Sequence, residues 1–252
     1  MTNPMKLNSW MTALLAAGFA LTSTGCTVTF TSDAAPTSSP VIANAANPTA
    51  ALPTSADVTG TWQITEAKGI DGTTYTGQVD IQSLGDVYRL TWDSSIGSYK
   101  GIGFLVEDQL FVGSGTDVEE YGVGVYRIQP DGTLEGQWTL PSSEGQVGTE
   151  TATKSGIGLT GTYQVQGVNP NNEGDYEGTL EIQQTGDTYQ LSWEVGSDVY
   201  TGVGLRSGDW LAVSWGEPGS FGVMAFAIAD NTMSGRWAVP DETQLGVENL
   251  AR

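Results

Sequence analysis

The chain has 252 residues, with 29 Asp and Glu against 9 Lys and Arg, so its formal charge is −20; it has no histidine. This acidity argues against a nucleic-acid partner and against electrostatic docking on anionic lipid. The missing imidazole excludes Ser-His-Asp and Cys-His catalysis and histidine metal ligands. Abundant glycine (34 residues), eight Trp and nine Tyr predict an all-β protein.

Residues 1–25 have the pattern of an export signal, with an apolar stretch at 10–21 that is too short to span a bilayer. The chain's single cysteine, Cys26, follows Gly25. This ending resembles the signal of bacterial lipoproteins, in which such a Cys becomes the lipidated N-terminus. The resemblance implies an exported protein of the cell envelope, facing the periplasm or the exterior and touching the membrane only through its lipid anchor. Ser23 stands where a Leu is usual, and cleavage without lipidation, giving a secreted soluble protein, is the alternative.

Residues 26–56 are rich in Thr, Ser, Ala and Pro and have no periodic apolar pattern. Such a segment cannot bury enough apolar surface to fold. Pro36, Pro40, Pro48 and Pro53 make it partly stiff. We expect a disordered linker that holds the folded part clear of the membrane.

The remainder contains two copies of one pattern, residues 57–154 and residues 157–252. The stretch 77–92 recurs as 178–193, with Gly, Ile, Gln, Gly-Asp, Tyr, Leu and Trp in the same places. Alternating apolar and polar residues on both sides of a Gly-Asp pair are typical of two strands joined by a tight turn. The repetition predicts two similar domains in tandem.

Each copy divides into about eight short strands separated by turn signals. In the second copy we expect strands near 161–167, 176–183, 188–194, 199–205, 209–215, 221–228, 232–238 and 246–252. Even spacing and short connections indicate an antiparallel meander. Eight strands can close into a barrel without free edges, so the sequence predicts two small up-and-down β-barrels, one for each copy. A two-sheet sandwich is the alternative.

Each copy begins with a Gly-x-aromatic triplet and ends with a basic residue. The first copy has Trp62 and Lys154, and the second has Tyr163 and Arg252. This arrangement is similar to the calycin group of small barrels, the lipocalins and avidins, in which the basic side chain covers the ring as the barrel closes. The resemblance implies that Lys154 covers Trp62 and Arg252 covers Tyr163. It also implies an alternative function, a carrier for a small apolar ligand.

A longer set of residues, most of which recur in both copies, forms a fuller pattern. In the second copy it comprises Gly161, Tyr163, Asn169, Pro170, Tyr176, Gly178, Gly186, Asp187, Tyr189, Trp193, Tyr200, Gly202, Gly204, Gly235, Trp237, Gly246 and Glu248. The pattern resembles a repeat of bacterial exported proteins, some of which are labelled fibronectin-binding, as in leptospires. The resemblance implies a tandem-repeat adhesin that binds an extracellular matrix protein such as fibronectin, and a glycan is a second partner class. No motif carries fibronectin binding residue by residue.

Carboxylate chemistry and metal binding have weaker signals. The adjacent acids Glu119–Glu120 would point to opposite faces of a strand, and Asp209 and Glu217 read as loop residues. Residues 169–180 match a calcium-binding loop only faintly, because Leu180 stands where the bidentate Glu belongs. We therefore predict a protein that is not an enzyme and has no cofactor or metal site, with a carboxylate-dependent hydrolase as the most distant alternative.

Two tryptophans, Trp210 and Trp215, occur only in the second copy, where the first copy has Gln109 and Ser114. Aromatic residues outside the repeated pattern could form a binding patch, and extra packing is the alternative. We take Trp210 and Trp215 as the candidate binding residues. The sequence therefore favours a non-enzymatic, lipid-anchored surface-binding protein, and the remaining alternative is an envelope structural module without a specific ligand.

Overall fold

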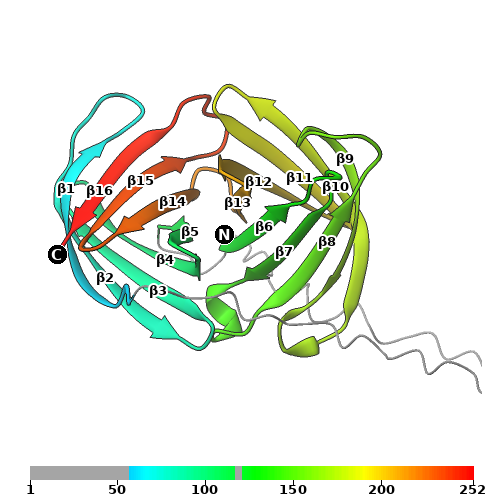
Figure 1. Cartoon of the computed structure of the whole chain (residues 1–252), viewed down its shortest axis with the longest axis horizontal. Helices are drawn as coiled ribbons and strands as arrows, with labels where there is room; N and C mark the ends of the chain where they lie inside the picture. Colours follow the sequence, from blue (N-terminus) through cyan, green and yellow to red (C-terminus); the bar gives the residue numbers. More distant parts are fainter. Residues whose placement is uncertain (1–56, 117–120) are drawn as a thin grey trace, which may run out of the picture. The chain divides into compact units, whose positions relative to one another are not determined.

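The computed structural model describes residues 57–116 and 121–252, which form two closed antiparallel β-barrels of eight strands each (Figure 1). The predicted all-β class and the two barrels are confirmed, and the sandwich is not observed. The predicted signal and linker, with Cys26, lie outside the described residues. Within the described residues, no helix has the length and apolar character needed to cross a membrane.

Sixteen strands are found in the described residues, and short turns join most of them. They are β1 (Gly60–Lys68), β2 (Gly77–Leu84), β3 (Val87–Ser94), β4 (Gly97–Val106), β5 (Gln109–Gly115), β6 (Tyr121–Ile128), β7 (Leu134–Thr139), β8 (Gly148–Thr153), β9 (Gly161–Val168), β10 (Asp175–Thr185), β11 (Thr188–Val195), β12 (Asp198–Ser207), β13 (Trp210–Gly216), β14 (Phe221–Ala229), β15 (Thr232–Ala238) and β16 (Gly246–Ala251). The eight strands expected in the second copy are all present, with ends within about two residues of the expected ones.

The barrels do not coincide with the two sequence copies. Barrel 1 consists of β1–β5 and β14–β16, and barrel 2 consists of β6–β13. Each barrel keeps the order of a meander, and β1 with β16 or β6 with β13 closes the ring. The predicted boundary at residues 155–156 therefore falls inside barrel 2, between β8 and β9. Barrel 2 is a continuous segment inserted into barrel 1, and each barrel takes five strands from one copy and three from the other.

Two crossover segments connect the barrels: residues 116–120 lead from β5 to β6, and residues 217–220 lead from β13 to β14. Between the described ends of these connections, the Thr116 N–H donates a hydrogen bond to the Ser220 carbonyl at 3.1 Å. In a barrel made from one copy, β5 would pair with β6. Instead β5 pairs with β14 and β6 pairs with β13, so the two copies exchange their last three strands.

A shared apolar core joins the two barrels along the outer faces of β4–β6 and β12–β14. Strands β5, β6, β13 and β14 are buried on both faces over most of their length, so their burial does not alternate. The buried residues of this core are Val87, Ile102, Phe104, Val106, Phe111, Tyr121, Val123, Val125, Val203, Leu205, Trp210, Ala212, Phe221, Val223, Ala225 and Ala238. Each barrel therefore buries part of its outer surface in this core, in addition to the apolar cluster in its own interior.

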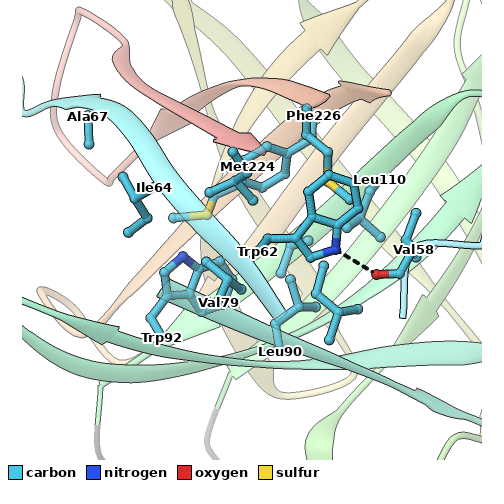
Figure 2. Packing of buried hydrophobic residues seen from close by; sticks show 14 of the residues in the cluster. Val58, Trp62, Ile64, Ala67, Val79, Leu90, Trp92, Leu110, Met224 and Phe226 are labelled. Carbon is cyan, nitrogen blue, oxygen red and sulfur yellow. Dashed lines mark hydrogen bonds between the residues drawn. The ribbon is translucent and has the colours of Figure 1, made fainter. Parts of the chain in front are cut away.

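The interior of each barrel is filled by large side chains. In barrel 1, Trp62, Trp92 and Phe226 are less than 2% exposed, and Figure 2 shows them packed together. The indole N–H of Trp62 donates to the Val58 carbonyl at 2.9 Å, the dashed line in Figure 2. A second apolar cluster, which includes Tyr163, fills barrel 2. Aromatic side chains thus supply the core that these short barrels need.

One end of each barrel is closed by a cation over an aromatic ring. The Arg252 guanidinium carbon lies 4.4 Å from the centroid of the Trp62 ring, and Lys154 Nζ lies 5.1 Å from that of Tyr163. Both cations also donate to backbone carbonyls just before the strand that carries the ring. The structure brings all four predicted closure residues into such pairs, but with the partners exchanged. The cause is the strand exchange, since the last strand of each copy closes the barrel that the other copy begins.

We expect Arg252→Ala to lower the free energy of unfolding by roughly 1–2 kcal/mol, because it removes a cation–π contact and charged hydrogen bonds. Because Arg252 covers Trp62, the double variant Arg252→Ala/Trp62→Leu should lose less stability than the sum of the two single variants. The losses from Arg252→Ala and Tyr163→Leu should simply add, because these residues are not in contact. Denaturant unfolding of the single and double variants measures both couplings. Coupling to Tyr163 in place of Trp62 would contradict the exchanged closure.

Candidate functional site

A carboxylate is buried at the same position of each barrel. Glu248 lies on β16 in barrel 1 and is 0% exposed, and Glu150 lies on β8 in barrel 2 and is 5% exposed. The alternation of buried and exposed residues along both strands directs these side chains into the barrels. Each interior therefore holds an ionisable group among apolar and aromatic side chains.

Three neutral donors surround Glu248. The Tyr75 hydroxyl and the Trp92 indole N–H donate to its two carboxylate oxygens at 2.8 Å, and the Tyr99 hydroxyl donates at 3.4 Å. Tyr75 comes from the β1–β2 loop, Trp92 from β3 and Tyr99 from β4. The Tyr99 ring stacks on Trp92 with centroids 4.8 Å apart and an angle of 13° between the planes. The carboxylate thus ties four separate parts of barrel 1 together.

Glu150 has an equivalent set of donors in barrel 2. The hydroxyls of Tyr126 and Tyr176 donate to it at 2.8 Å, and the Trp193 indole N–H donates at 3.3 Å. Tyr176 and Trp193 are the counterparts of two donors in barrel 1. The third donor, Tyr126, comes from β6, where barrel 1 has Phe226 on β14. The same kind of cluster is therefore built twice, with one donor changed.

Burial raises the pKa of both carboxyls above its ordinary value, and the hydrogen bonds from Tyr and Trp offset part of that rise. Burial, together with the nearby carboxylate, also raises the pKa of the surrounding tyrosines. Within residues 57–116 and 121–252, no Lys or Arg forms an ion pair with Glu150 or Glu248. Nor does that part of the chain bring three His, Cys, Asp or Glu side chains together as metal ligands would be. Each buried carboxyl is therefore held by neutral donors, without a Lys or Arg partner among the described residues.

The predicted binding residues do not form one patch. Trp210 is 5% exposed in the shared core, 6.3 Å from the Phe111 ring centroid. Trp215 is half-buried in barrel 2, with its ring centroid 6.0 Å from that of Trp138 and 5.9 Å from that of Trp193. Trp210 and Trp215 are five positions apart on β13, and because an odd offset along a strand changes the face, they point to opposite faces.

The buried acids were not among the candidate residues taken from the sequence. Both belong to a Gly-x-Glu triplet, Gly148–Glu150 and Gly246–Glu248, near the end of each copy. On a strand, these glutamates take the inward position that an apolar residue normally occupies. An acid that recurs at an apolar position of a strand is the signal that could have identified them.

A scan against protein-family models, a search of curated proteins and a search of solved structures each found no match to this chain. The calycin and leptospiral resemblances therefore stay predictions. Function has to be argued from the residues and their geometry.

Proposed function

We propose that the protein is an exported, envelope-anchored, non-enzymatic binding protein that engages a macromolecular partner with the outer faces of its barrels. One observation carries the proposal: the two interiors are filled, whereas many outward residues of β1–β3, β9 and β10 are polar and exposed. They include Gln63, Gln78, Gln82, Thr91, Gln164, Gln166, Glu181 and Gln183. Long amide and carboxylate side chains on a sheet are suited to hydrogen bonding with a partner.

The filled interiors speak against the alternative of a carrier for an apolar ligand. The interior of barrel 1 contains the fully buried rings of Trp62 and Phe226, and the interior of barrel 2 contains the ring of Tyr163. A carrier of the calycin kind needs an open lumen in an eight-stranded barrel. Here the side chains occupy that volume, so recognition by the outer surface is favoured.

The charge of the chain favours a basic protein partner over an acidic glycan. The formal charge is −20, and only Glu150 and Glu248 are buried among the acids of the described residues. Such a surface attracts basic regions of extracellular proteins and repels anionic polysaccharides. Fibronectin, named by the repeat family that the chain resembles, is the first partner to test. Lipidation at Cys26 and the linker 26–56 would hold the barrels at the envelope surface.

We expect the fragment 57–252 to bind immobilised fibronectin saturably and more tightly than an unrelated matrix protein. Because hydrogen bonds accompany the charge attraction, binding should weaken with added salt but survive at physiological ionic strength. Surface plasmon resonance over a salt series measures this. Absence of saturable binding, or complete loss of binding in modest salt, would overturn the proposal.

A matched pair of variants tests which barrel carries the contact. Gln82 and Gln183 are exposed at equivalent positions of the two barrels, so Gln82→Arg and Gln183→Arg make the same change in charge. The variant on the binding face should lower affinity by about tenfold, because it places a cation against a basic partner. If neither variant alters affinity, the contact does not lie on these strand faces.

A further inference from the structure

We infer that barrel 1 binds a small organic ammonium ion at its mouth, with Glu248 as the counter-ion and the surrounding aromatic rings as the cage. The mouth is the end opposite the Arg252–Trp62 closure, where β1 runs into the β1–β2 loop and β3 turns into β4. Glu248 lies across from Ala67, near the end of β1, and Trp92 pairs with Tyr99 beside the β3–β4 turn. This small-molecule site is separate from the outer faces proposed above.

The charge balance of the cluster favours a cationic ligand. Glu248 is 0% exposed, its three donors are neutral, and no cation within the described residues pairs with it. A buried carboxylate without a counter-charge is costly, and an ammonium ion would supply the missing charge. The net charge of −20 also concentrates cations around the protein.

The side chains around the carboxylate are those that recognise ammonium groups. Tyr75, Trp92 and Tyr99 donate to Glu248, and Trp237 packs against the same cluster beside the Tyr75 hydroxyl. Aromatic faces attract an ammonium ion through their quadrupoles, most strongly where water is excluded. Tyr99 and Trp237 are only half-buried, so they separate the cluster from solvent.

The two barrels differ in the side chains that cover this end, although the carboxylate is buried in both. In barrel 2 the Trp215 ring packs over Trp138 and Trp193 at the mouth. Barrel 1 has Ser114 at the position of Trp215, and the Tyr99 ring stacks on Trp92 in its place. The mouth of barrel 1 is therefore covered by a tyrosine from a hairpin, whereas that of barrel 2 is covered by an indole.

The equivalent tyrosine of barrel 2 interacts with a different carboxylate. Tyr200 in barrel 2 lies near Asp198, and burial followed by that carboxylate raises its pKa to about 12. Tyr99 instead reaches inward to Glu248, through the longest of the three hydrogen bonds, and barrel 1 has Gly97 where barrel 2 has Asp198. Outward rotation of Tyr99 would open the carboxylate to a ligand and leave its other two donors in place.

The test is titration of the purified full chain with choline and with its neutral isostere 3,3-dimethyl-1-butanol, followed by calorimetry and tryptophan fluorescence. We expect one choline site per chain and at least about tenfold weaker binding of the alcohol, because the alcohol lacks the charge. Equal binding of the two probes, or no binding of choline up to millimolar concentration, would overturn the inference.

Substitutions in the two barrels test whether choline binds at Glu248 of barrel 1. Glu248→Gln and Ser114→Trp should each weaken choline binding about tenfold or more, whereas Glu150→Gln, the matched change in barrel 2, should leave it unchanged. Tyr99→Phe should tighten binding, because it keeps the ring and removes the hydrogen bond that holds it inward; this variant keeps the test valid if the others unfold. Equal effects of Glu248→Gln and Glu150→Gln would refute the assignment to barrel 1.

Discussion

Cleavage of the chain between β8 and β9 should leave both barrels assembled. The two fragments correspond to the two sequence copies, and each barrel needs strands from both of them. Ile157 in this connection is 84% exposed, so the connection can accept a protease site. Size-exclusion chromatography and native mass spectrometry after cleavage should show one species with the mass of the uncut protein. The fragments should separate only when denaturant unfolds the barrels, because separation breaks the β5–β14 and β6–β13 pairings and exposes the shared core.

Barrels formed by single copies would give a clearly different result. If each copy formed its own barrel, cleavage would release two folded species of about half the mass, each with its own unfolding transition. The uncut variant with the same inserted site serves as the control for any effect of the insertion. Isolated fragments should also unfold at much lower denaturant concentration than the cleaved complex. Each fragment lacks three strands of one barrel and five strands of the other.

Replacing the buried carboxylates should have the largest effect of any single substitution in the barrels. Glu248→Ala leaves the Tyr75 hydroxyl and the Trp92 indole N–H without their acceptor inside barrel 1, and we expect a loss of roughly 2–4 kcal/mol in the free energy of unfolding. Glu248→Gln keeps an acceptor oxygen and should cost much less. Chemical denaturation at fixed pH compares the two variants.

The same carboxyl should give stability a defined pH dependence. Burial raises the pKa of Glu248 above the ordinary value of 4.5, so the folded state binds more protons than the unfolded state between the two pKa values. The contribution of Glu248 to stability is therefore fully present below about pH 4.5 and falls as the pH rises through the raised pKa. Unfolding free energies of the wild type and Glu248→Gln, measured from pH 4 to 8, should differ by an amount that changes with pH, with the variant gaining stability relative to the wild type as the pH rises.

The difference between the two curves isolates Glu248 from other acids. The exposed carboxyls of Asp57, Asp71 and Asp131 accept hydrogen bonds from Thr59, Thr73 and Thr133, respectively, which lower their pKa. These three acids change stability in the direction opposite to Glu248, because their contribution is lost as the pH falls. Their effect is common to both proteins and cancels in the difference. Parallel curves would mean that the Glu248 carboxyl has the same pKa in the folded and unfolded states.

Local sequence patterns predicted the strands and the pairing of neighbouring strands, but not the exchange of strands between the two copies. Period-2 alternation and the Gly-Asp turn placed β10 and β11 correctly, because a hairpin depends on neighbouring residues alone. The choice between β6 and β14 as the partner of β5 depends on residues far apart in the sequence, and the two copies offer similar strands. The continuous burial of β5, including Leu110, Phe111 and Val112, reflects the second barrel behind it.

Local sequence was also insufficient to identify the candidate site, because its contacts join residues that are far apart in the chain. Trp210 is predicted as a binding residue because it is not repeated, with extra packing as the alternative, and the structure places it in the core between the barrels. Because Glu248 and Glu150 occur in both copies, repetition does not distinguish them from the other residues of the common pattern. Their importance depends on donors such as Tyr75, which lies 173 residues from Glu248 in the sequence. Only the closed barrel brings these groups together.

Because β1 pairs with β16, the first and last strands of the described residues are neighbours. The order in which the barrels follow one another along the chain therefore depends only on where the polypeptide is opened. Arg252 reaches back to the carbonyls of Asp57 and Thr59, so residues 57 and 252 lie close together. A short peptide could join them, and a new opening in the crossover 116–120 would give a circular permutant. In that permutant β6–β13 and then β14–β16 with β1–β5 would follow one another as two uninterrupted barrels. The native arrangement and a simple tandem of barrels therefore differ by a single cut and a single ligation.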